Sequence, residues 1–187
     1  SMAWAASFAP AASAEAGAED YVRDLRDSVV AVLDETTPRS PSREGRLRHL
    51  FLGAFDAPTI AERVLGRHWQ SLGNDERQRY AKAVPAYLAA IYASQFADFR
   101  SQSFEIVGSR ELDGQETGVQ TVVQGIGMVK PMGIEVRVRR GETGFRIRDV
   151  AIGGISVLAT KRDEFDSFLR RENPTTLIAL IEEFAAE

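Results

Sequence analysis

The chain has 187 residues and a formal net charge of −4, from 27 acidic and 23 basic side chains. This balance argues against a nucleic-acid-binding protein, because neutralising phosphates requires a positive surface. The sequence contains no Cys and only two His, so it cannot form a disulfide framework or a thiolate zinc site. No stretch approaches the roughly 20 apolar residues of a membrane span, and the length suits one domain.

Helical periodicity dominates the first half of the chain. Apolar side chains recur every three or four positions over residues 20–34, and the proline-containing residues 38–41 then interrupt the pattern. A second amphipathic helix is predicted over 47–54, and Asp56 can cap a short third helix. We expect the Ala-rich residues 1–18 to be a disordered leader or tag remnant.

The longest predicted helix begins near Asn74, a residue type that is favoured as an N-cap. Its apolar side chains form two adjoining stripes, and together these are wider than one neighbouring element can cover. We therefore expect this helix at the centre of the fold. A kink is predicted at Pro85, because proline removes one backbone hydrogen bond.

The pattern changes to a period of two after residue 101, as is typical of β-strands. The predicted strands cover residues 104–108, 118–126, 132–140 and 145–152. Turn residues lie at 113–114 and 141–144, so the strands are expected to form an antiparallel meander. Apolar side chains alternate with Arg along the last two strands, which predicts one apolar face and one basic, solvated face.

Two helices are predicted after the sheet. One begins at Thr160, where residues 160–163 have the form of a capping box, and the other begins at Asn173 and Pro174. The sequence shows neither an internal repeat nor a second domain. It predicts a single α+β domain over residues 19–187, with one four-stranded antiparallel sheet packed on helices from both ends of the chain.

Three segments of the chain match known motifs. Residues 55–69 read FDAPTIAERVLGRHW, and residues 76–92 read ERQRYAKAVPAYLAAIY. The most specific segment is 149–165, DVAIGGISVLATKRDEF, with the pattern D-V, then G-[VI]-S, then R-x-E-F. On these motifs the chain resembles the MlaC (toluene-tolerance) family of phospholipid-binding proteins, over about residues 47–184.

The resemblance implies an NTF2-like fold in which a curved sheet and the helices hold acyl chains in an apolar pocket. It also implies a monomeric periplasmic carrier of the Gram-negative envelope, with no cofactor and no catalytic activity. Such a carrier exchanges phospholipid with inner- and outer-membrane transport complexes through transient membrane contact, and it binds no nucleic acid. A hopanoid-associated, HpnM-like branch shares most of the motifs, so a hopanoid is the alternative cargo.

Apolar residues of the sheet and of the longest helix are the predicted walls of that pocket. The expected contacts with lipid tails are Trp69, Leu88, Ile91, Tyr92, Phe96, Ile134, Val136, Val138, Phe145, Ile147, Ile155 and Val157. Extracting one diacyl lipid exposes roughly thirty methylenes, each worth ~0.8 kcal/mol on burial, so a carrier requires a deep and dry pocket. Every one of these residues would also suit an ordinary core, and only the resemblance favours a cavity.

Two other function classes remain open. The expected basic stripe on the polar face of the sheet consists of Arg137, Arg139, Arg146 and Arg148. It can dock an acidic partner or an anionic membrane. Alternatively, it is solvated and paired with Glu105, Glu135 and Glu142. With a filled core, such a chain would be an interaction module. A small-molecule enzyme would use Asp149, which follows Ile147 along the fourth strand, as a base. The preferred role of Asp149 is a structural salt bridge to a neighbouring Arg.

Overall fold

The computed structural model describes residues 10–97, 101–112, 115–125 and 129–186. Its helices are α1 (Pro10–Glu35), α2 (Pro41–Ala54), α3 (Ala57–Leu65), the 3-10 helix η1 (Gly66–Ser71), α4 (Asn74–Ala97), α5 (Val157–Leu169) and α6 (Pro174–Ala186). Its strands are β1 (Ser101–Leu112), β2 (Glu116–Gly125), β3 (Met132–Gly141), β4 (Gly144–Ile152) and β5 (Ile155–Ser156). The predicted α+β fold is confirmed, with one additional short strand. The turn expected at 113–114 lies outside the described residues.

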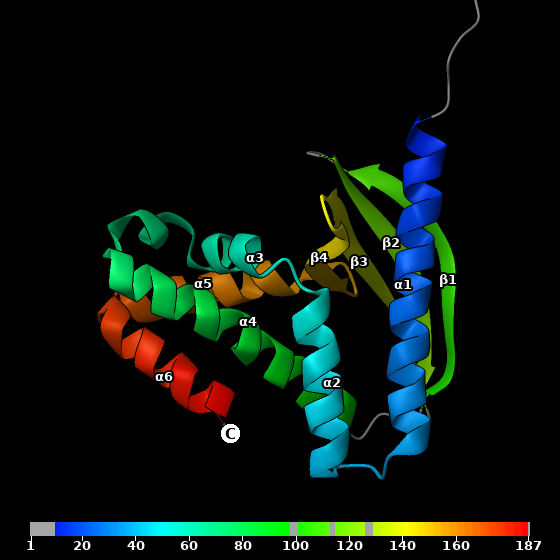
Figure 1. Ribbon diagram of the computed structural model, residues 1–187, viewed down its shortest axis with the longest axis horizontal. Helices are drawn as coiled ribbons and strands as arrows, with labels where there is room; N and C mark the ends of the chain where they lie inside the picture. Colours follow the sequence, from blue (N-terminus) through cyan, green and yellow to red (C-terminus); the bar gives the residue numbers. More distant parts are fainter. Residues whose placement is uncertain (1–9, 98–100, 113–114, 126–128, 187) are drawn as a thin grey trace, which may run out of the picture.

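The sheet is an antiparallel meander in the order β1-β2-β3-β4-β5, as the sequence predicts. Helix α1 lies along the sheet and packs on β1, β2 and β3 (Figure 1). The other helices gather beside the β4 edge, where α4 packs against α2, α3 and α6 (Figure 1). The central position expected for α4 is therefore confirmed, and this helix continues through Pro85. No helix among the described residues is long and apolar enough to cross a membrane.

A β-bulge in β4 changes which side chains face α1. Val136 of β3 lies opposite Val150, whereas Val138 lies opposite Ile147, so β4 has one more residue than β3 between these pairs. The extra residue moves Val150 to the apolar face of the sheet and leaves Asp149 opposite Arg137 on the polar face. Simple alternation from Ile147 would place residue 149 on the apolar face, but the bulge places Asp149 on the opposite face.

Side-chain caps fix where several helices begin. Asp56 caps α3 as predicted, and its carboxylate accepts a hydrogen bond from the Thr59 backbone N–H. The predicted start of α5 at Thr160 was wrong: the helix begins at Val157, because the Ser156 hydroxyl accepts a hydrogen bond from the Ala159 N–H at 3.0 Å.

Helix α1 begins earlier than the sequence suggests. Its first residue is Pro10, so residues 10–18 of the expected disordered leader are helical, while residues 1–9 lie outside the described part of the chain. Alanine is the strongest helix former, and Ala18 is fully buried in the core. At Gly17, an added Cβ would lie 3.1 Å from the Phe145 ring, so this part of α1 packs closely on β4.

Candidate functional site

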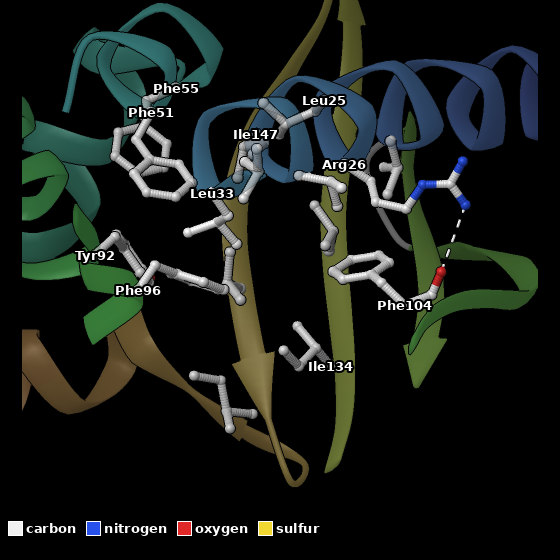
Figure 2. Close-up of a pocket in the computed structure, with 16 residues that line it drawn as sticks. Leu25, Arg26, Leu33, Phe51, Phe55, Tyr92, Phe96, Phe104, Ile134 and Ile147 are labelled. Atoms are coloured by element: carbon white, nitrogen blue, oxygen red, sulfur yellow. Dashed lines mark hydrogen bonds between the residues drawn. The ribbon is translucent and has the colours of Figure 1, made fainter. Parts of the chain in front are cut away.

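An apolar cavity lies between α1, the sheet and the aromatic ends of α2 and α4 (Figure 2). Within the described part of the chain its surface is entirely apolar, and fifteen of the sixteen residues that line it there are aliphatic or aromatic; the sixteenth is Arg26. The cavity volume is ≈ 90 Å³, and the empty space between its walls, counted out to the open mouth, is ≈ 820 Å³. The volume of ≈ 90 Å³ describes the room available to a bound molecule, since the volume of ≈ 820 Å³ includes open solvent.

One wall of the cavity is a face of α1. The side chains that form it are Val22, Leu25, Val29, Val30 and Leu33. Four of them follow the three- and four-residue spacing of one helix face, which the sequence predicts as amphipathic. Burial of this apolar face against the sheet is what holds α1 over the cavity.

Four aromatic rings close one end of the cavity, where α2 and α4 meet (Figure 2). Phe51 lies 5.9 Å from Tyr92 and 5.7 Å from Phe96, measured between ring centroids. Phe55, the C-cap residue that follows α2, lies 5.6 Å from Tyr92 between ring centroids. Burial, together with the charge of Asp149, raises the pKa of the Tyr92 hydroxyl, so this tyrosine stays neutral at physiological pH.

The sheet supplies the opposite wall. Its lining side chains come from β1, β3 and β4, and they are Phe104, Ile134, Val136, Ile147, Val150 and Ile152. The bulge in β4 matters here, because it replaces Asp149 by Val150 on this wall. Without that extra residue the wall would carry a carboxylate.

Five of the twelve predicted tail contacts line this cavity: Tyr92, Phe96, Ile134, Val136 and Ile147. The structure places the other seven away from the lining. Leu88 and Val138 are fully buried in the core, Ile91, Phe145 and Val157 are half-buried elsewhere, and Ile155 is largely exposed on β5. Trp69 packs on Tyr80 with a centroid separation of 6.2 Å, under the guanidinium of Arg77.

The α1 face and Phe51, Phe55, Phe104, Val150 and Ile152 were missed as cavity residues. The periodicity of residues 20–34 is visible in the sequence, but it does not show which element the apolar face packs against. The two β4 residues were missed because their orientation depends on the bulge.

Ion pairs organise the polar face of the sheet. Arg137 bonds to Glu135 at 2.8 Å and to Asp149 at 3.1 Å, and Glu135 also pairs with Arg110 at 2.7 Å. Partial burial opposes ionisation of Glu135, but its bonds to Arg137 and Arg110 outweigh this and lower the pKa of its carboxyl. The expected pairing of the stripe with Glu135 is thus present.

The remaining members of the predicted basic stripe differ in their surroundings. Arg148 is bonded to Asp56 and lies 3.5 Å from Glu116, so it is largely buried rather than presented to a partner. Arg146 donates to the Phe145 carbonyl at 2.8 Å, and Arg139 lies beside it on β3. Docking through the stripe therefore remains a prediction that depends mainly on Arg139 and Arg146.

Asp149 is a structural residue on the side of the sheet away from the cavity lining. Its carboxylate accepts hydrogen bonds from the Val150 N–H at 2.8 Å, the Leu158 N–H at 3.2 Å and the Ser156 hydroxyl at 2.6 Å. With the ion pair to Arg137, these bonds join β4 to the start of α5. The expected salt bridge of Asp149 to a neighbouring Arg is thus present. Across the described residues, no cluster of three or more potential metal ligands is present.

The family follows from comparison with known proteins. The model of a family described as "MlaC protein" matches residues 23–183. The chain belongs to the MlaC family. A solved structure of the phospholipid-binding protein from Ralstonia solanacearum, in complex with a phospholipid, is similar to this MlaC-family chain with a TM-score of 0.70. That likeness covers 88% of this chain and 94% of the other at 20% sequence identity, so it concerns the fold. No curated protein sequence matches the chain significantly.

Proposed function

We propose that this protein is a periplasmic carrier that binds the acyl chains of one phospholipid between α1 and the sheet. The observation that supports the proposal most strongly is the entirely apolar surface of the cavity, in a chain of the MlaC family. An apolar pocket with few polar groups suits hydrocarbon, because any unpaired polar group inside it would cost free energy on contact with a tail. The phospholipid bound to the Ralstonia protein, on a similar fold, also supports this cargo.

The narrow cavity leads to a mechanism in which α1 moves. A volume of ≈ 90 Å³ holds a few water-sized molecules. Two acyl chains carry roughly thirty methylenes, each worth ~0.8 kcal/mol on burial, and they need far more room than this. The wall that can yield is α1, because its contacts with the sheet across the cavity are apolar and a lipid tail can replace them.

Hydrogen bonds hold the C-terminal end of α1 more firmly than its N-terminal half. The buried guanidinium of Arg43 donates to the carbonyls of Leu33 and Thr36, both at 2.5 Å, and so caps the C-terminal turn of α1. Further along the helix, single hydrogen bonds join Tyr21 to the Ala54 carbonyl at 3.1 Å and Glu19 to Ser109 at 2.6 Å. We propose that α1 swings outward about its C-terminal end when lipid enters.

The proposed carrier is a monomer that uses no cofactor, performs no catalysis and exchanges cargo with inner- and outer-membrane complexes. Transient membrane contact is supported by two exposed apolar side chains, Val129 at 96% and Ile155 at 68% exposure. Both lie at one end of the sheet, where the Gly153 N–H bonds to the Gly133 carbonyl at 2.9 Å. Exposed apolar side chains can enter the interfacial region of a bilayer.

A vesicle transfer assay tests the carrier proposal. Donor vesicles carry a fluorescent phospholipid with a quencher, acceptor vesicles carry neither, and the protein is added in catalytic amounts. A carrier gives transfer that rises with protein concentration and persists when donor and acceptor vesicles are separated by a membrane that retains vesicles but passes the 20.6 kDa protein. Absence of transfer, with no lipid bound to the recovered protein, would contradict the proposal. Preferential uptake of a hopanoid from mixed vesicles would instead assign the alternative cargo.

A further inference from the structure

Arg26 is the one charged side chain among the described residues of the cavity lining. It lies on α1 between the apolar positions Leu25 and Val29, and its aliphatic stem forms part of the cavity wall. Its guanidinium extends away from the cavity, towards β1 (Figure 2). The side chain is 25% exposed, so the charge lies at the rim, partly in water and beside the apolar space.

The present contacts of this guanidinium are weak ones. Nε and Nη2 of Arg26 lie 2.7 and 2.6 Å from Oδ1 of Asp27, a carboxylate that is itself 61% exposed. Exposed ion pairs of this kind contribute little, because water competes for both partners. Nη1 donates to the Phe104 carbonyl at 3.5 Å, which is at the long limit of a hydrogen bond. A stronger acceptor at the rim can therefore replace these contacts at little cost.

A phospholipid provides such an acceptor at the right place. When its tails fill the apolar space, its phosphodiester must come to lie where the wall first offers a donor, since a buried and unpaired phosphate would be highly unfavourable. A guanidinium binds phosphate through two parallel, charge-assisted hydrogen bonds. Among the described residues that line the cavity, only Arg26 can supply them.

We propose that Arg26 binds the phosphodiester of the cargo, so that the protein selects glycerophospholipids over neutral lipids with the same tails. This inference rests on the proposed lipid-carrier function. On binding, the Arg26 guanidinium exchanges the Phe104 carbonyl and the Asp27 carboxylate for two phosphate oxygens. The exchange also releases one contact between α1 and β1, which lowers the resistance to outward movement of α1.

The test compares two lipids on matched variants. Wild type, Arg26→Gln and Arg26→Lys are titrated with phosphatidylcholine and with diacylglycerol of the same acyl chains, both presented in vesicles. Arg23→Gln is the control, because Arg23 lies on the same helix, is paired with Asp20 and does not line the cavity. Thermal unfolding of each variant checks that the fold is intact.

The expected result is a loss of phosphatidylcholine affinity of roughly tenfold or more in Arg26→Gln, the size of a charge-assisted hydrogen bond to an ionised group. The diacylglycerol affinity of Arg26→Gln stays within about twofold of wild type. The phosphatidylcholine affinity of Arg26→Lys lies between those of wild type and Arg26→Gln, and that of Arg23→Gln matches wild type. Asp27→Asn, which frees the guanidinium, raises phosphatidylcholine affinity.

Three results would overturn the inference. Equal phosphatidylcholine binding by wild type and Arg26→Gln would show that Arg26 makes no phosphate contact, while the proposed carrier function would still stand. An equal loss of both lipids in Arg26→Gln would assign Arg26 to the wall itself. If wild type bound neither lipid, the proposed function would fail together with this inference.

Discussion

Two valines on β3 allow the cavity to be distinguished from the ordinary core. Val136 and Val138 lie on the same face of the same strand, but only Val136 lines the cavity, whereas Val138 is 0% exposed and outside it. Replacement of either by Phe adds four carbon atoms. At Val136 these atoms enter existing space, where burial at about 0.8 kcal/mol per carbon offsets an overpacking cost of about 1–3 kcal/mol.

The two substitutions are therefore expected to have opposite effects. Val136→Phe changes the free energy of unfolding by less than about 1 kcal/mol but blocks lipid binding, since the added ring occupies the cavity. At Val138 the added ring has no space, so Val138→Phe is expected to lower the free energy of unfolding by about 1–3 kcal/mol. The melting temperature then falls by roughly 2–4 °C per kcal/mol, while lipid binding persists.

Urea unfolding and lipid titration of both variants provide the measurement. The reasoning would be refuted if Val136→Phe lost as much stability as Val138→Phe and still bound lipid. That result would mean that Val136 packs in a filled core and that the cargo binds elsewhere.

Three further substitutions test the framework around the cavity. Arg43→Met leaves the carbonyls of Leu33 and Thr36, at the C-terminal end of α1, without their buried donor; the expected loss in the free energy of unfolding, measured with urea, is about 1–3 kcal/mol. Asp149→Asn weakens the bonds to Arg137 and to the start of α5, with an expected loss of about 1.5–3 kcal/mol, while lipid affinity, measured by titration, is unchanged. Hydrogen bonds from Arg170, His68 and Arg67 lower the pKa of the Asp166 carboxyl in the folded protein. The ionised carboxylate therefore stabilises the fold above the ordinary carboxyl pKa of about 4, and this stabilisation is lost as the pH falls below that value. Melting curves between pH 7 and pH 3 should therefore show the difference between wild type and Asp166→Asn shrinking towards acid; a constant difference would contradict this linkage.

Periodicity predicted which face of a helix or strand is apolar, but not what that face packs against. The alternation of β3 and the wide apolar face of α4 correctly identified apolar surfaces, and Ile134, Val136, Tyr92 and Phe96 do line the cavity. The same patterns also selected Leu88 on α4, which is buried in the core instead. Both environments require apolar side chains, so a single sequence cannot separate a cavity wall from a filled core.

Two local features limited the prediction of the site. The β4 bulge reverses the alternation after Arg148, and no Gly or Pro at residues 145–152 marks it in the sequence. The sequence analysis placed the start of α5 at Thr160, whereas the structure has Ser156 as its N-cap. Ser156 is used because Asp149 can then accept both its hydroxyl and the Leu158 N–H, a combination that depends on tertiary structure.

Native mass spectrometry of the freshly purified protein tests the central claim most directly, when it is followed by extraction and identification of any bound lipid. We expect one phospholipid per protein chain, with a mass that gives the number of acyl chains, and we expect Val136→Phe to carry none. Protein that is free of lipid as purified, and that also takes up no phospholipid from vesicles, would contradict the claim that the cavity beneath α1 is a lipid-binding site.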